Sequence, residues 1–200
     1  VADPGRYNRR VRRLLPLEAR TGVVVRRRSW PRGTRASLAP RELETRSEPF
    51  AAHPLGIIAP PDHPYAALSD VPPALLARER FLLRERGSGT RAAMDRYFQS
   101  LRIEPVPAME MRSNESIKQA VMAGMGLAFL SLHTIALERA NGLIRILEVP
   151  GLPLVRRWQL VHLKGKLLSP PAEALRYYVL EQGEALLARL FPGLVVPAVG

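Results

Sequence analysis

Between about His53 and Leu190, short apolar runs alternate with amphipathic stretches, and this alternation constrains the fold of the chain more than any other feature. Proline, glycine and asparagine, which favour turns, separate many of these segments. Strands that alternate with helices are typical of an α/β domain, in which helices cover a sheet. Strands are predicted at 55–59, 81–83, 106–112, 127–130, 143–149 and 157–162.

Five helices are predicted among these strands, and two of them have a recognisable apolar face. In the helix at 113–125, Ile117, Val121 and Met125 are spaced four residues apart, and glycines follow at its end. The helix at 170–190 is the longest. Its buried side is predicted to consist of Leu175, Val179, Leu186 and Leu190. The other helices are predicted at 72–79, from the 85–91 loop to about 101, and at 134–140.

The first 50 residues differ from the rest in composition. They contain 13 arginines, no lysine and five acidic residues, whereas the other 150 contain 17 basic and 13 acidic residues. Only 23–25 looks like the core of a strand, and charged sequence without periodicity is typical of loops or disorder. A basic nucleic-acid-binding protein that uses residues 1–50 as an arginine-rich arm therefore stays open as an alternative function.

The sequence gives little support for catalysis. Ser88 lies in no GxSxG motif, and 87–91 lacks the GxxxxGK[ST] pattern of a phosphate-binding loop. No carboxylate pair can be placed across a cleft. None of the histidines has metal-ligand spacing, and structural roles are expected for the first, second and fourth of them. The four are His53, His63, His133 and His162. We therefore expect no enzyme, no catalytic residue, no metal and no cofactor.

The chain contains no cysteine, which excludes disulfides and thiol chemistry. No stretch approaches the roughly 18 consecutive apolar residues that a membrane helix needs. The opening VADPGRYNRRVRRLL has no apolar run followed by a small-residue cleavage site. We therefore expect a cytoplasmic protein with no membrane partner. A solute-binding protein, the other alternative, would need an export signal.

Four motifs occur in an order and at a spacing that point to one family. They are HPLGIIAPPDHP at 53–64, RERGSGTR at 84–91, SNESIKQAVMAGMGLAFLS at 113–131 and RRWQLVHLKGKLLSPPAEAL at 156–175. On these motifs, the stretch from His53 to about Leu190 resembles the effector-binding domain of LysR-type transcriptional regulators. The resemblance is greatest to those that control Calvin-cycle operons.

The resemblance implies an α/β fold like that of type-2 periplasmic binding proteins, with two Rossmann-like lobes, an interlobe cleft and two crossing strands. The effector-binding domain would span 51–191. Its second lobe would run from about 59 to 161, and 51–58 with 162–191 would belong to the first lobe. Full-length relatives also carry an N-terminal helix-turn-helix domain, and no such pattern occurs in this chain.

Residues 1–50 match poorly the two strands and helix with which family members open this domain. The first lobe is therefore expected to be incomplete or altered. Three explanations stay open for this segment: translation in another reading frame upstream of about 47–53, a pseudogene-like remnant, or simple divergence.

Two turns from strand to helix supply the donors that an anionic ligand needs. A helix N-terminus has unpaired N–H groups and a partial positive charge. At the first turn, Ser88 and Thr90 can add hydroxyl donors and Arg91 can add a guanidinium. The second turn contains Ser113 and Asn114, and the resemblance places this turn at the cleft. Helix capping by the serine, threonine or asparagine side chains, and a surface ion pair of Arg91, are the alternatives.

The resemblance implies a sensor domain that binds a small anionic metabolite and thereby controls transcription. In Calvin-cycle regulators such effectors include NADPH and phosphorylated sugars. Family members dimerise through this domain and bind DNA as tetramers. A homodimer or homotetramer is therefore expected, with DNA bound only through a helix-turn-helix domain that this chain lacks.

Overall fold

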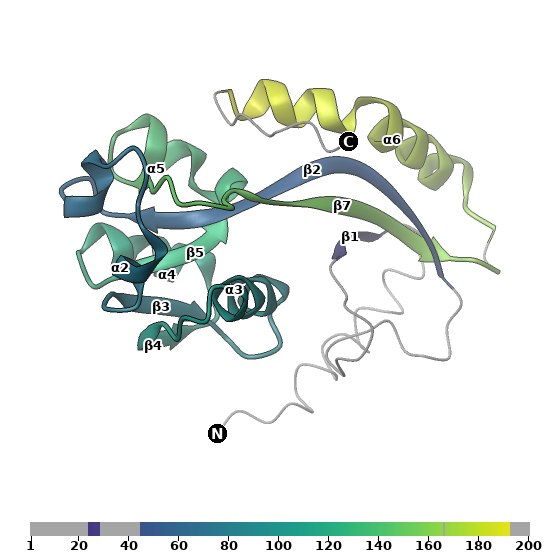
Figure 1. Ribbon diagram of the computed structural model, residues 1–200. Helices are drawn as coiled ribbons and strands as arrows, with labels where there is room; N and C mark the ends of the chain where they lie inside the picture. Colours follow the sequence, from purple (N-terminus) through teal and green to yellow (C-terminus); the bar gives the residue numbers. More distant parts are fainter. Residues whose placement is uncertain (1–23, 29–44, 166, 193–200) are drawn as a thin grey trace. The chain divides into compact units, whose positions relative to one another are not determined.

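The computed structural model describes residues 24–28, 45–165 and 167–192 (Figure 1). These residues divide into two compact units. The first unit contains the described residues up to Ala52 together with Arg157–Leu190, and the second contains His53–Arg156 and the described residues after Leu190. The border therefore crosses two strands, β2 (Thr45–Ala59) and β7 (Leu154–Leu163).

The second unit is built on a mixed sheet with the strand order β2-β5-β3-β4, and β6 pairs with β2. Strand β3 is parallel to both β4 and β5, whereas β2 is antiparallel to β5 and β6. The carboxyl ends of β3, β4 and β5 therefore lie at the same edge of the sheet. The residue bounds of these strands are β3 (Arg80–Arg84), β4 (Val106–Met111), β5 (Leu127–Ser131) and β6 (Arg145–Ile146).

Both faces of this sheet are covered by apolar side chains. Phe81 packs in one cluster with Phe98 of α3 (Gly89–Ser100), while its neighbour Leu82 packs in the other with Ile117 of α4 (Asn114–Met122). Alternate residues of a strand point to opposite faces, so α3 and α4 cover opposite sides. The shorter helices of the unit are η1 (Pro64–Ala67), α2 (Pro73–Leu76), η2 (Leu132–Ile135) and α5 (Ala136–Ala140).

The predicted α/β alternation is confirmed, and most differences are in element length. The strand predicted at 143–149 is only two residues long, and the helix at 72–79 only four. Met125 lies beyond the end of α4 and is 44% exposed, so it does not extend the buried face of Ile117 and Val121. The helix stops earlier because Gly124 takes a positive φ of 72°.

In the first unit, β7 is hydrogen-bonded to β2 and to the antiparallel β1 (Val24–Arg28), with Val24 opposite Val161. The strand predicted at 23–25 therefore corresponds to β1 from Val24 onward, and β2 begins at Thr45. The predictions for 1–23 and 29–44 lie outside the described residues. No helix in the described ranges is long and apolar enough to span a bilayer.

The buried face of α6 (Pro170–Leu190) was predicted only in part. Leu175 and Leu190 are 51% and 58% exposed, whereas Val179 and Leu186 are half-buried. The buried positions are Ala172, Arg176 and Gly183. Small residues lie on this side because the strands come close: a Cβ added at Gly183 would be 2.8 Å from the ring of Phe50. The helix therefore contacts its unit through a narrow strip that includes a charged residue.

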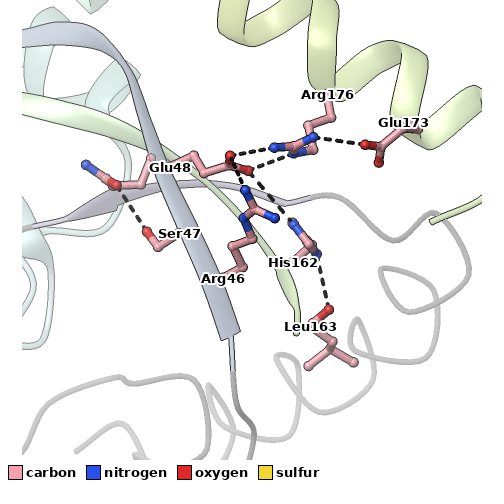
Figure 2. Close-up of polar contacts among 8 residues, drawn as sticks. Arg46, Ser47, Glu48, His162, Leu163, Glu173 and Arg176 are labelled. Carbon is pink, nitrogen blue, oxygen red and sulfur yellow. Dashed lines mark hydrogen bonds and ion pairs between the residues drawn. The ribbon is translucent and has the colours of Figure 1, made fainter. Parts of the chain in front are cut away.

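That charged residue belongs to an ion cluster centred on Glu48 (Figure 2). Arg176 binds both oxygens of the Glu48 carboxylate, with Nε 2.7 Å from Oε2 and Nη2 2.5 Å from Oε1, and also donates to Glu173 at 2.9 Å. Arg46 lies 3.3 Å and His162 3.9 Å from the same carboxylate. The hydrogen bonds from Arg176 lower the pKa of Glu48, so the cluster holds β2, β7 and α6 together around an ionised carboxylate.

Candidate functional site

The carboxyl edge of the sheet in the second unit brings the two predicted turns together. Arg84 is paired with Met111 at the ends of β3 and β4, and the Glu85 amide donates to the Met111 carbonyl at 3.1 Å. Nη1 of Arg84 also donates to Oδ1 of Asn114 at 2.5 Å. In open α/β sheets ligands bind outside the carboxyl ends of the strands. The turns that open α3 and α4 are therefore neighbours at an edge suited to a ligand.

The first turn runs from Glu85 to the start of α3. Its fold depends on Gly87, which has a φ of +92° that side chains other than glycine rarely adopt. Ser88 is the N-cap, and its hydroxyl accepts a hydrogen bond from the Thr90 amide at 3.3 Å. The capping alternative for Ser88 is therefore confirmed. Thr90 is only 2% exposed, whereas Gly89 reaches the surface and Ser88 is half-buried.

The second turn opens α4 in the same way. Ser113 is its N-cap, with its hydroxyl accepting from the Ser116 amide at 3.4 Å, and it is exposed. Asn114, the first residue of the helix, is half-buried and accepts from Arg84. The first amides of a helix have no backbone acceptor within it. The serine caps bind the amides of Thr90 and Ser116, and both turns present their other first amides at the same edge of the sheet.

Arg91 has several protein partners. Its Nε donates to Asp95 at 2.8 Å, and its Nη1 lies 3.2 Å from the Arg84 carbonyl and 3.4 Å from a carboxylate oxygen of Glu110. The ion-pair alternative therefore describes the contacts observed for Arg91. A ligand at this residue would compete with two carboxylates, and the role of Arg91 in binding stays a prediction.

Sequence reasoning missed a second arginine at the first turn. Arg156, in β7, is 8% exposed and its Nη1 donates to the Gly89 carbonyl at 2.9 Å. It lies 67 positions from its partner in the sequence, and the RRWQ motif gave only a strand, so no local signal could have identified it. A buried cation thus lies against the first residue of α3.

A third polar group lies where β5 ends at the same edge. Nε2 of His53 is 2.8 Å from the hydroxyl of Ser131, and the Thr134 hydroxyl donates to the Ser131 carbonyl at 2.7 Å. The ring of His133 stacks on that of His53 with centroids 6.2 Å apart. His53 and Ser131 are both buried, so the structural role expected for His53 is confirmed.

The other histidines also contact protein groups. Nδ1 of His63 accepts from the Tyr65 amide at the start of η1, and Nδ1 of His162 lies 3.1 Å from the Leu163 carbonyl. Within the described ranges, no three or more histidine, aspartate or glutamate side chains are grouped so that they could hold a metal ion.

A buried ion pair links α4, the helix that the second turn opens, to α5. Nζ of Lys118 on α4 lies 2.7 Å from Glu138 on α5 and 2.9 Å from Glu115. Burial disfavours the charged amine, but the hydrogen bonds to both carboxylates outweigh it and raise the pKa of Lys118. The pair fixes α4, and with it Ser113 and Asn114, against the neighbouring helix.

Comparison with known proteins decides the family. The model of the LysR substrate binding domain matches residues 34–184, which is more than half of the chain and begins inside the arginine-rich first quarter. The chain belongs to the LysR substrate-binding domain family. Proteins of this family are transcriptional regulators and not enzymes, as the sequence predicted.

Among relatives of this LysR domain are an HTH-type transcriptional regulator and a RuBisCO operon transcriptional regulator. It is 46% identical over 156 residues to the HTH-type transcriptional regulator CfxR of Cupriavidus necator, covering 78% of this chain and 49% of CfxR. It is also 46% identical over 151 residues to a RuBisCO operon transcriptional regulator of Allochromatium vinosum, covering 76% of this chain and 50% of that protein. The chain thus spans about half the length of these curated relatives.

A solved relative supports the fold assigned to this LysR domain. The regulatory domain of CcmR from Synechocystis PCC6803, in complex with 2-PG, has a TM-score of 0.71 and 31% identity, and the match covers 92% of this chain and 80% of that domain. The fold is therefore that of LysR regulatory domains, which resemble periplasmic binding proteins, as predicted.

Proposed function

We propose that this LysR effector-binding domain senses a small anionic metabolite, and that the turns opening α3 and α4 form the ligand contact. The supporting observation is their adjacency, since the bond between Arg84 and Asn114 joins the two turns. Both are helix N-termini, whose amides and partial positive charge favour a carboxylate or a phosphate. The proposed ligand contacts are those predicted from the sequence, namely Ser113, Asn114, Ser88, Thr90 and Arg91. Of these, Thr90 is 2% exposed and Arg91 also binds Asp95 and Glu110.

The proposal agrees with the ligand found in a solved relative of the chain. The CcmR regulatory domain was solved with 2-PG. By this likeness, 2-PG is the first compound to test, and the resemblance to Calvin-cycle regulators adds NADPH and phosphorylated sugars. Ligand can shift a regulator between two states only by its difference in affinity for them.

The activities of the whole protein are proposed from its relatives. The domain would control transcription of carbon-fixation genes in the cytoplasm as a homodimer or homotetramer. Contact with DNA would be made by a helix-turn-helix domain, as the name of CfxR indicates, and not by the two turns.

Replacing Ser113 and Asn114 together by alanine tests the ligand contact. We expect the double variant to lose the thermal stabilisation that 2-PG or NADPH gives the unmodified chain, because two side chains and the geometry of one helix N-terminus are removed. Losing the Ser113 cap costs about 1 kcal/mol of unfolding free energy without ligand. Differential scanning fluorimetry with and without ligand separates these effects.

Asn141→Ala is the matched control, because Asn141 is an exposed asparagine at the end of α5 in the same unit. It should leave the ligand-induced shift unchanged. An unchanged shift in the Ser113→Ala/Asn114→Ala variant would remove these two residues from the site.

A further inference from the structure

Arg156 is a buried, charged residue that lies against the first turn of the candidate site. It is 8% exposed, and its Nη1 donates to the carbonyl of Gly89 at 2.9 Å. Both terminal nitrogens lie 3.7 Å from the point where a Cβ on Gly89 would be. The guanidinium therefore lies directly against the open side of the first residue of α3.

This placement adds charge where the backbone is already positive. The N-terminus of α3, a helix of 12 residues, carries unpaired amides and a partial positive charge. An arginine is normally favourable at the other end of a helix, so its presence here raises the local positive potential. Arg84 at the neighbouring strand end forms an ion pair with Glu85, which offsets its charge, so Arg156 is the main source of this added potential.

Because Gly89 has no side chain, a ligand could reach the start of α3, where this positive potential lies. Gly89 reaches the surface, and a ligand atom could approach its Cα, the amides of the turn and the guanidinium of Arg156 together. Arg91, on the same helix, binds Asp95 and Glu110, whereas the contact with Gly89 is made by Arg156. Of the two arginines, Arg156 is thus the one placed against the open start of the helix.

We propose that Arg156 is the specificity-determining cation of the effector site, which selects an anionic ligand at the N-terminus of α3. This inference rests on the proposed function and assigns to it a residue of β7. Arg156 is the last residue of the second unit before β7 enters the first. A ligand bound by Arg156 would therefore contact one of the two strands that pass between the units as well as the turn.

The test compares Arg156→Gln with Arg157→Gln in the 200-residue chain by isothermal titration calorimetry with 2-PG and with NADPH. Arg157 is the next residue of the same strand and is exposed, so its replacement removes the same charge without touching the turn. We expect Arg156→Gln to raise the Kd about 10- to 100-fold, the loss typical of a charge-assisted hydrogen bond, and Arg157→Gln to change it less than about 2-fold. Arg156→Lys should give an intermediate loss.

A second variant covers the case in which Arg156→Gln does not fold. Gly89→Ala leaves the charge in place, and its methyl group makes only ordinary contact with the guanidinium at 3.7 Å. It should fold, because alanine is tolerated in the first turn of a helix, but raise the Kd about 5-fold or more by occupying the open side of Arg156. Salt should weaken ligand binding to the unmodified chain more steeply than to Arg156→Gln, a difference that a merely structural arginine would not produce.

If Arg156→Gln binds the ligand as tightly as the unmodified chain does, the assignment of Arg156 is overturned and the proposed function is left intact. Gly89→Ala takes the place of Arg156→Gln in this comparison if Arg156→Gln does not fold. No binding of either compound to the unmodified chain would instead contradict the proposed function, and the inference with it.

Discussion

Replacing Gly126 by alanine is expected to destabilise the chain by about 3–5 kcal/mol. Gly126 has a φ of +150°, and a Cβ there would lie 2.5 Å from the backbone carbonyl oxygen of Arg80 at the start of β3. Neither a rotamer change nor a flexible neighbour can relieve this contact, since the atom it meets belongs to the main chain. Urea unfolding followed by circular dichroism would measure the loss.

Gly124→Ala is the matched control two residues earlier. Gly124 also has a positive φ, of 72°, but nothing lies within 4 Å of its added Cβ. Only the backbone strain remains, and we expect a loss of about 1 kcal/mol. Similar losses for both variants would contradict the close approach of Gly126, the residue before β5, to the Arg80 carbonyl.

Removing Arg176 should have the second large effect. Arg176→Ala is expected to cost about 2–4 kcal/mol of unfolding free energy, because the half-buried Glu48 carboxylate loses both of its strongest hydrogen bonds. Removing both charges with Glu48→Gln and Arg176→Met should cost less than Arg176→Ala alone, since no isolated charge is left. A double variant less stable than Arg176→Ala would argue against this explanation.

The same carboxylate predicts an acid dependence. The hydrogen bonds from Arg176 hold the pKa of Glu48 below its ordinary value of 4.5 in the folded chain. Its contribution is therefore fully present above about pH 4.5, and is lost as the pH falls through the lowered pKa. Stability measured against pH should fall less steeply below pH 4.5 in Glu48→Gln than in the unmodified chain.

The two turns could be predicted from sequence because their signals are local. Ser88 and Ser113 each lie between a short apolar run and a helical pattern, and both were found as N-caps. That the turns adjoin follows from the parallel pairing of β3 with β4, which the strand and helix alternation already favoured.

What could not be predicted depends on contacts between distant parts of the chain. Arg156 meets Gly89, and His53 meets Ser131, through strand pairings that no spacing reveals. Two of the four residues predicted for the buried face of α6 were wrong for a related reason. Leucines fit a helical period on more than one side, and only the close approach of Phe50 shows that Gly183 lies on the buried side.

Amide chemical shifts of the isotopically labelled chain, followed by nuclear magnetic resonance during titration with 2-PG and then NADPH, test the central claim most directly. We predict that the largest saturable shifts occur at residues 88–91 and 114–116. The bound anion would lie against these two helix N-termini and accept from those of their amides that the serine caps leave open. Saturable shifts confined to other residues, with these two groups unchanged, would contradict the placement of the effector site.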